Sequence, residues 1–563
     1  MDTSQIILSA GVEDAERTRL LFGSSSEDST SFSRSSSRGY KSSFSIFSTG
    51  GAVSWRNVKL SLWRRLPRTR PVIYVLLIHL FQYFGYRLLA EQNSVHIIQP
   101  SEWNNTIFSV GIYGFPALFY PIGGILGDVY FGRKLMSRIC LFIIWFFSIL
   151  LTINFTICSY VSKDNVAFNV VLPIVFLVII GIFEGIFEIN LLTYGAGQLC
   201  NSPSEEVSSF IYMWYWTKNL AAVLGILSST GFRKVSTAVA GRSGFPPLAA
   251  ATALTVALLL HRACQDNFET ESRNRNPIRH ICGVLCNAAH SRPKHQFISA
   301  FRYGEDPPSG LEYARQYHGG KYTDEQVQDV RSFGRILLVI LTLSGFVSTY
   351  GAYLSMSNYQ VKHLKEISPL ERKYFLFHQL SSLTVYSVVV LLIPLLNNLI
   401  FPFMSNYLPN SRKRIGLGLA FGFLSVLLAA CLGSKTSDDN LLLYLLLSSV
   451  VMGIAETSVF VPILEFIYAQ SPDNMKGLLI GCHYFLIGVW SAVVSVIYFG
   501  VKNEYTGDGH KHDDPKWPMY YYISYSVVSL VGLILFCIVS LFYRNRQRNN
   551  PISDIMRISM YYK

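Results

Sequence analysis

Long apolar runs alternate with short polar connections along most of this chain. The first apolar run covers residues 71–90, and a transmembrane helix needs roughly 20 such residues. Further apolar segments begin near Ile107, Leu135, Ala167, Phe210, Pro246, Phe333, Phe375, Ile415, Leu441, Gly477 and Met519. The pattern therefore predicts an all-α membrane protein with twelve transmembrane helices, embedded in the lipid bilayer.

One connection is much longer than the others, and it lies between the sixth and seventh apolar segments. It divides the chain into two sets of six expected helices. The predicted parts are a disordered serine-rich tail (1–66), an N-terminal six-helix half (67–262), a central loop (263–332), a C-terminal six-helix half (333–545) and a C-terminal tail (546–563).

Charge changes this picture by giving the expected helices an orientation. Charged residues make up 15% of the 563 residues, against about 25% in soluble proteins. The net charge of +13 collects in part at segment ends, for example at Arg133 and Lys134. By the positive-inside rule these ends and both tails are expected in the cytosol. The basic excess is thus a topology signal, and no nucleic-acid partner is expected.

Enzyme chemistry finds no support in the residues. The nine cysteines are scattered without a CxxC pair, and no nucleophile, metal set or cofactor loop is placed. No cofactor, no metal and no enzymatic activity are therefore expected.

Two short motifs outside the apolar segments bear on location. Glu16, Leu20 and Leu21 form an acidic dileucine pattern, which would bind cytosolic sorting adaptors and direct the protein to endosomes or lysosomes. A polar tail without a signal, and a plasma-membrane location, stay open as alternatives. Asn104 begins an Asn-Asn-Thr pattern, which predicts glycosylation on the non-cytosolic side.

A glycine-rich run at residues 123–134 connects the second apolar segment to the third. Glycines allow helices to approach closely and the chain to turn, and a carboxylate can face the N-terminus of a neighbouring helix. The run resembles the signature of the major facilitator superfamily, which implies two six-helix halves and alternating access. Its members here are Gly124, Asp128, Gly132 and Arg133, expected to form a conformational latch.

Three stretches narrow this resemblance to one family. Residues 210–221 read FIYMWYWTKNLA, Glu456 and Glu465 are nine positions apart, and residues 311–330 form a distinctive loop. They resemble the proton-dependent oligopeptide transporter (POT/PTR) family, most closely its peptide/histidine branch. The resemblance implies a small-molecule substrate held between the halves. Glu456 would attract its amine, and Tyr83 and Asn190 would hydrogen-bond it.

The departures from the family concern charge. The first-helix ExxER motif of the family is replaced by Leu76, His79 and Leu80, and the family's fourth-helix lysine falls on Glu188. Lys218 occupies an apolar position of the family. We expect Lys218 to neutralise Glu188 and to restore a positive group at the substrate site. A salt bridge that only stabilises the bundle is the alternative.

Proton coupling, if present, needs other residues than the family's own. Glu184 and Glu188 are one helical turn apart, so one of them would hold a proton in a medium of low dielectric constant. His79 and His483 are further candidates, because histidine titrates between about pH 5 and 8. A hydrogen-bonded core histidine and an idle, ionised Glu184 are the alternatives.

The sequence thus predicts a secondary active transporter that moves small peptides or histidine-like amino acids, with protons as the expected co-substrate. Two other functions stay open. The charge changes would suit a different small amine or cation, and the loss of coupling residues would suit a non-transporting endolysosomal sensor or adaptor.

Overall fold

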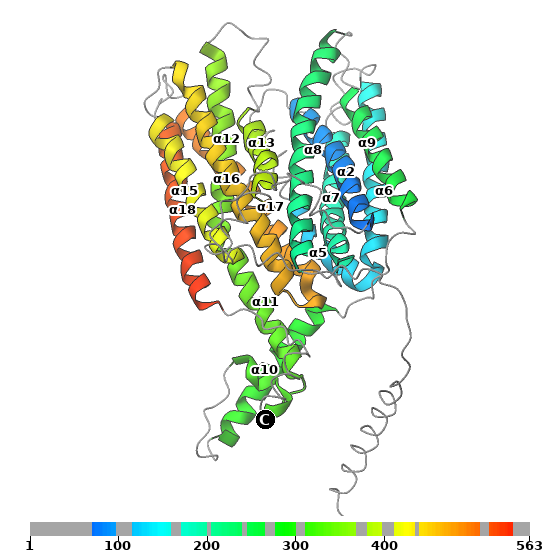
Figure 1. The fold of residues 1–563 in the computed structure, drawn as a ribbon, viewed down its shortest axis with the longest axis vertical. Helices are drawn as coiled ribbons and strands as arrows, with labels where there is room; N and C mark the ends of the chain where they lie inside the picture. Colours follow the sequence, from blue (N-terminus) through cyan, green and yellow to red (C-terminus); the bar gives the residue numbers. More distant parts are fainter. Residues whose placement is uncertain are drawn as a thin grey trace, which may run out of the picture. The chain divides into compact units, whose positions relative to one another are not determined.

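The structure is a computed structural model that describes residues 70–96, 115–158, 171–199, 204–238, 245–264, 276–299, 310–367, 380–396, 410–433, 438–506 and 517–543. These residues are almost entirely helical (Figure 1). Within them no strand forms, and the only β-type pairing is the isolated bridge between Arg315 and Tyr322. The all-α prediction is confirmed.

Helices of the N-terminal half follow one another through the bundle. They are α2 (Arg70–His96), α4 (Phe115–Ala117), α5 (Phe119–Ile125) with the π-helical turn η5 (Leu126–Phe131), α6 (Arg133–Cys158), α7 (Leu172–Gly197), α8 (Ser204–Ala238) and α9 (Phe245–Ala263).

The C-terminal half continues the same pattern. Its helices are α11 (Asp324–Thr342), α12 (Ser344–Ile367), α13 (Leu380–Leu395), α15 (Ser411–Gly433), α16 (Asp438–Gln470), α17 (Lys476–Thr506) and α18 (Trp517–Phe542). Each of the twelve apolar segments expected from the sequence contains helix in the described ranges. In those ranges, nine stretches are long and apolar enough to cross a membrane, and α13 is a shorter apolar helix.

Helices pack mainly within their own half. In the N-terminal half α2 packs on α8 and α9, and α6 on α7; in the C-terminal half α15 packs on α16 and α18. Contacts between the halves run through α17 with α5 and α7, and through α8 with α13 and α16. Figure 1 shows α17 in the middle of the bundle, beside α8 of the N-terminal half. Groups on these helices are therefore placed to sense the relative position of the halves.

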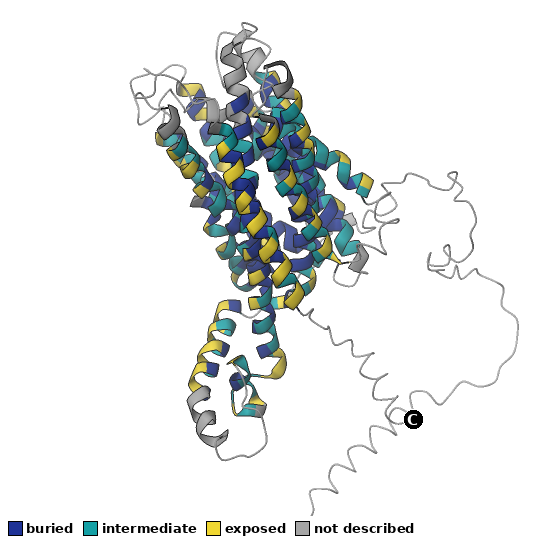
Figure 2. Ribbon diagram, turned by 90° about the vertical axis from the view of Figure 1, so that its left-hand side faces the viewer, coloured by how far each residue is buried: buried dark blue, intermediate teal, exposed yellow. Residues whose placement is uncertain are grey.

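The outer faces of the helices are apolar. Leu391 is 73% exposed and Phe542 81% exposed, and Figure 2 shows such exposed residues spread along the helices. Lipid chains solvate these side chains, as expected for helices that span a bilayer. In contrast α7 buries residues over most of its length, including Glu184 and Glu188. An acid at such a place needs a partner, a proton or water.

A helical segment lies between the halves in the sequence. It comprises α10 (Pro277–Ser299), the 3-10 turns η8 (Gly310–Ala314) and η9 (Gln316–His318), and the first turns of α11. Thr323 caps α11 in a capping box with Gln326. Figures 1 and 2 show α10 beyond one end of the bundle. It is joined to that end by a hydrogen bond between His280 and Asn474, 3.2 Å long.

Candidate functional site at the interface between the halves

Glu456 lies in the interior of α16 and is 3% exposed. Its Oε1 accepts a hydrogen bond from the Tyr215 hydroxyl of α8 at 2.7 Å, and its Oε2 accepts one from the Tyr350 hydroxyl of α12 at 3.1 Å. The acid thus joins both halves, because Tyr215 belongs to the N-terminal half. Two hydroxyl donors compensate part of the cost of burying a carboxylate, and an incoming ammonium group would supply the rest.

Lys218 and Glu188 form a salt bridge between α8 and α7. The pairing hypothesised from the sequence is thus present, and it belongs to the N-terminal half. The Lys218 ammonium also lies 5.2 Å from the ring centroid of Tyr83 and 5.0 Å from that of Tyr484. Both distances are in the range of cation–π attraction. Since Tyr484 belongs to α17, this cation also contacts both halves.

His79 is fully buried in α2, stacked on Trp214 with ring centroids 3.6 Å apart. Its Nδ1 is 3.1 Å from the Thr217 hydroxyl oxygen, while its Nε2 has no partner among the described residues. His483 on α17 packs on Phe460 and Tyr484. The two histidines therefore occupy different halves, and His79 has one ring nitrogen available for a proton.

Glu184 is 2% exposed on α7. It accepts a hydrogen bond from the side-chain amide of Gln82, which is fully buried on α2. Of the two acids on α7, Glu188 is therefore paired with the Lys218 ammonium, whereas Glu184, one turn away, is paired with a neutral amide.

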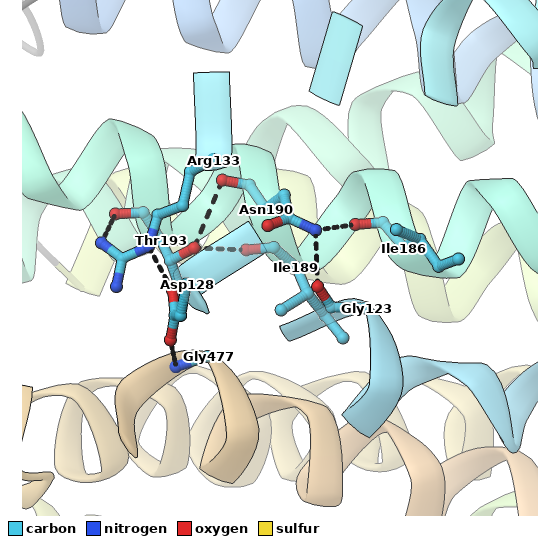
Figure 3. Close-up of polar contacts among 8 residues, drawn as sticks. All are labelled: Gly123, Asp128, Arg133, Ile186, Ile189, Asn190, Thr193 and Gly477. Carbon is cyan, nitrogen blue, oxygen red and sulfur yellow. Dashed lines mark hydrogen bonds and ion pairs between the residues drawn. The ribbon is translucent and has the colours of Figure 1, made fainter. Parts of the chain in front are cut away.

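The glycine-rich run forms a contact with the other half at one end of the bundle (Figure 3). Asp128 Oδ1 accepts from Arg133 Nε at 2.6 Å, and Asp128 Oδ2 accepts from the backbone N–H of Gly477 at 3.2 Å. Gly477 lies in the first turn of α17, so the carboxylate faces a helix N-terminus and its partial positive charge. Gly132 has φ 81°, a left-handed conformation that favours glycine and lets the chain turn into α6.

Glycines also set how closely α5 and α17 pack. A Cβ atom on Gly124 would collide with the backbone of Gly477. One on Gly481 would lie 2.7 Å from the Pro121 Cα atom and 2.8 Å from the Tyr120 carbonyl oxygen. The two halves therefore touch by backbone at this end, which leaves no room for even a methyl group.

Asn190, expected to hydrogen-bond a substrate, contacts the glycine-rich run in this structure (Figure 3). Its side-chain amide donates to the carbonyl oxygens of Gly123 at 3.0 Å and Ile186 at 2.7 Å. One donor hydrogen thus holds α5 against α7, and the other is used within α7. The geometry favours a structural role for Asn190 over contact with a substrate.

A second link between the halves closes the same end, and no role for it was expected from the sequence. Glu465 at the end of α16 accepts from the Ser208 hydroxyl of α8 at 2.9 Å and pairs with Arg414 at 3.0 Å. Arg414 also donates to the Tyr212 hydroxyl at 2.7 Å. The sequence did contain a signal for this link, because Glu465 and Tyr212 both lie in motifs that carry the family resemblance.

Four of the residues singled out in the sequence lie outside the described residues. They are Glu16, Leu20 and Leu21 of the dileucine pattern and Asn104 of the glycosylation pattern. Conversely, the sequence did not single out four groups that contact Glu456, Lys218 or Glu184: the hydroxyls of Tyr215 and Tyr350, the ring of Tyr484 and the amide of Gln82. Together with Glu188 these residues form the buried cluster.

Comparison with known proteins gives a consistent result. A sequence model of the POT family, PTR2, matches residues 141–507. Mouse solute carrier family 15 member 3 is 22% identical over 440 residues, covering 67% of this chain and 73% of the relative. Human solute carrier family 15 member 5 is 25% identical over 397 residues, covering 62% of this chain and 63% of the relative.

Solved structures show the same fold. An auto-inhibited POT family peptide transporter has a TM-score of 0.60 at 16% identity, covering 86% of this chain and 99% of the solved chain. A POT family transporter in complex with 5-aminolevulinic acid has a TM-score of 0.51 at 13% identity, covering 85% and 98%. At these identities the likeness establishes the arrangement of the helices.

Proposed function

Since the chain belongs to the POT family and is a multi-pass secondary transporter, we propose that it moves small amine-bearing solutes, namely histidine-like amino acids or short peptides, together with protons. The halves would rock about the buried cluster in alternating access. The observation that carries the proposal is the position of Glu456, held by hydroxyl groups from both halves. A substrate bound there would be in contact with each half throughout the cycle.

The charges of the site define the substrate class. Glu456 provides an anion for a substrate amine, and Lys218 provides a cation for a substrate carboxylate. In this structure Lys218 is bound to Glu188, so a substrate carboxylate would compete with Glu188 for the ammonium. An amine and a carboxylate at opposite ends of one small molecule fit this arrangement best.

The latch would act on the conformational equilibrium. Asp128 with Gly477 and Glu465 with Ser208 both join the halves at one end, so the structure represents the state closed at that end. The basic residues Arg133, Arg412 and Arg414 support a cytosolic location for this end and for both tails, by the positive-inside rule. An endolysosomal membrane would supply the acidic compartment that drives export toward the cytosol, and the dileucine pattern at Glu16, Leu20 and Leu21 supports this location.

The test is uptake of labelled histidine and of a labelled dipeptide into proteoliposomes with an inward proton gradient. We expect uptake by the wild type, and an at least tenfold lower rate for Glu456→Gln. Glu325→Gln is the matched control, because Glu325 is an exposed acid of α11. Equal rates for all three proteins would contradict the role of Glu456. No uptake of either compound by folded wild-type protein would contradict the proposed substrate class and direct the search to other amines or to an adaptor function.

A further inference from the structure

Three of the buried acids, Glu184, Glu188 and Glu456, differ in how their charge is compensated. Glu188 forms a salt bridge with the Lys218 ammonium, and Glu456 accepts hydrogen bonds from two tyrosine hydroxyls. The partner of Glu184 is the amide of Gln82, which donates to Glu184 Oε2. Among the described residues no donor reaches Glu184 Oε1, and none reaches Gln82 Oε1. A carboxylate buried with one neutral donor is costly.

One proton would satisfy both atoms. A protonated carboxyl group has one O–H donor and one carbonyl acceptor, and a primary amide offers both functions in return. With a proton on Oε1, Glu184 can donate to Gln82 Oε1 while Gln82 Nε2 donates to Glu184 Oε2. The acid and the amide then match group for group, and no buried acceptor of the pair is left without a donor.

In the part of the chain that the structure describes, no positively charged group near Glu184 is available to compensate its charge in place of this proton. Lys218 acts on both acids of α7 but is bonded to Glu188. The ionisable groups that face Glu184 from packed helices are otherwise uncharged in their usual forms: Tyr83 on α2, Tyr120 on α5 and Cys140 on α6. His79 on α2 is bonded to Thr217 and Trp214 stacks on it, while His483 and Tyr484 approach from α17. The Lys218 ammonium balances one of the two carboxylates, Glu184 and Glu188, so the three groups together are neutral only when the second carboxylate holds a proton.

We propose that Glu184, hydrogen-bonded to Gln82, is the binding site of the coupling proton. The inference rests on the proposed transport function and assigns a residue that is not part of the family's first-helix motif. When the halves separate and water enters, the O–H bond of Glu184 breaks, the proton passes to water and the electron pair stays on the carboxylate. The resulting anion attracts Lys218, whose ammonium also contacts Tyr484 of the other half. Release of the proton would thereby change the contact between Lys218 and Tyr484 at the interface between the halves.

Infrared difference spectroscopy of the purified full-length protein tests the proton directly. Spectra of wild type and Glu184→Gln at neutral pH are compared in the region of the carboxylic-acid C=O stretch. The proposal predicts that one acid band disappears in the variant. Gln82→Met keeps Glu184 and should shift that band, which provides a second readout if Glu184→Gln fails to fold. Glu325→Gln, which changes an exposed acid, should leave the acid region unchanged.

Transport assays give the complementary readout. The amide introduced by Glu184→Gln imitates the protonated acid, since it pairs with Gln82 as the acid does. We expect Glu184→Gln to retain substrate exchange within about twofold and to lose at least tenfold in accumulation driven by a proton gradient. Loss of a carboxylate band instead of an acid band, or gradient-driven accumulation at the wild-type level, would overturn the proposal. If the wild type transports neither probe, the proposed function fails, and the infrared result still decides the protonation of Glu184.

Discussion

The Asp128 carboxylate accepts a hydrogen bond from the backbone N–H of Gly477 at 3.2 Å, across 349 residues of sequence and between the two halves. This contact exists only while α5 and α17 are packed at this end. It therefore makes the free energy of closing that end depend on one charge. The other Asp128 oxygen is held by Arg133 at 2.6 Å, which orients the carboxylate toward α17.

Removing that charge should favour opening at the Arg133 end. Asp128→Asn replaces one accepting oxygen by an NH2 group, so the side chain can accept from Arg133 or from Gly477 but not from both, and the remaining bond loses the carboxylate charge. We expect alkylation of a reporter, Leu478→Cys, to rise roughly tenfold, equivalent to ~1.4 kcal/mol. Fragment-ion mass spectrometry of the peptide assigns the label to position 478 and separates it from the native Cys482, four residues away. The control is Asp473→Asn, because Asp473 is 83% exposed and pairs with Lys476 at the same end. Equal reporter alkylation in both variants would refute the latch.

Close packing of glycines makes a second prediction about the same interface. Gly481→Ala places a methyl group 2.7 Å from Pro121 Cα, so the closed state must shift. We expect at least a tenfold loss of transport from protein that still folds. Gly500→Ala is the matched control on α17, since nothing lies within 4 Å of its added Cβ. The close-packing account fails if Gly481→Ala transports like Gly500→Ala.

The Lys218–Glu188 pair should show strong thermodynamic coupling. Lys218→Gln or Glu188→Gln alone leaves a buried charge without its partner, at a cost of about 3–5 kcal/mol. We expect lowered thermal stability in detergent for each single variant and recovery in the double variant. Additive destabilisation in the double-mutant cycle would show that the two groups do not depend on one another. Recovery of stability without recovery of transport would separate the substrate role from the structural one.

The two tyrosine hydroxyl groups that donate to Glu456 should affect the affinity for substrate. Tyr215→Phe and Tyr350→Phe each remove a hydrogen bond to a charged group, worth about 1.5–3 kcal/mol. We expect KM for substrate to change about tenfold or more, with protein yield preserved. Tyr520→Phe, at an exposed position of α18, is the control. Unchanged KM in both buried variants would place the substrate elsewhere.

Much of the fold was predictable because membrane helices have a clear sequence pattern. Apolar runs of sufficient length predict spans, and the expected segments all contain helix where the structure describes them. Helix ends were less well predicted. α8 begins at Ser204 and α11 at Asp324, before the apolar runs at Phe210 and Phe333, because polar residues extend these helices beyond the expected membrane boundary.

The sequence indicated which types of residue form the site better than it indicated which residues contact one another. The Lys218–Glu188 pairing followed from two charges that replace family residues, and the structure brings them together. For Asn190, a position that matches the family does not reveal whether the side chain faces a substrate or a neighbouring helix, and the structure shows it bonded to Gly123 of α5. Gln82 and Tyr350 were not identified at all. Their roles depend on the rotation of α2 and α12, which periodicity alone does not determine.

Simultaneous measurement of substrate and proton flux shows whether the two move together through the protein. Proteoliposomes containing the wild-type protein and an internal pH indicator are given an inward gradient of histidine or a dipeptide, with no initial pH difference. Our account predicts that substrate entry acidifies the interior, in proportion to the substrate taken up, and that Glu184→Gln abolishes the acidification while substrate exchange continues. Substrate entry by the wild type without any acidification would contradict it.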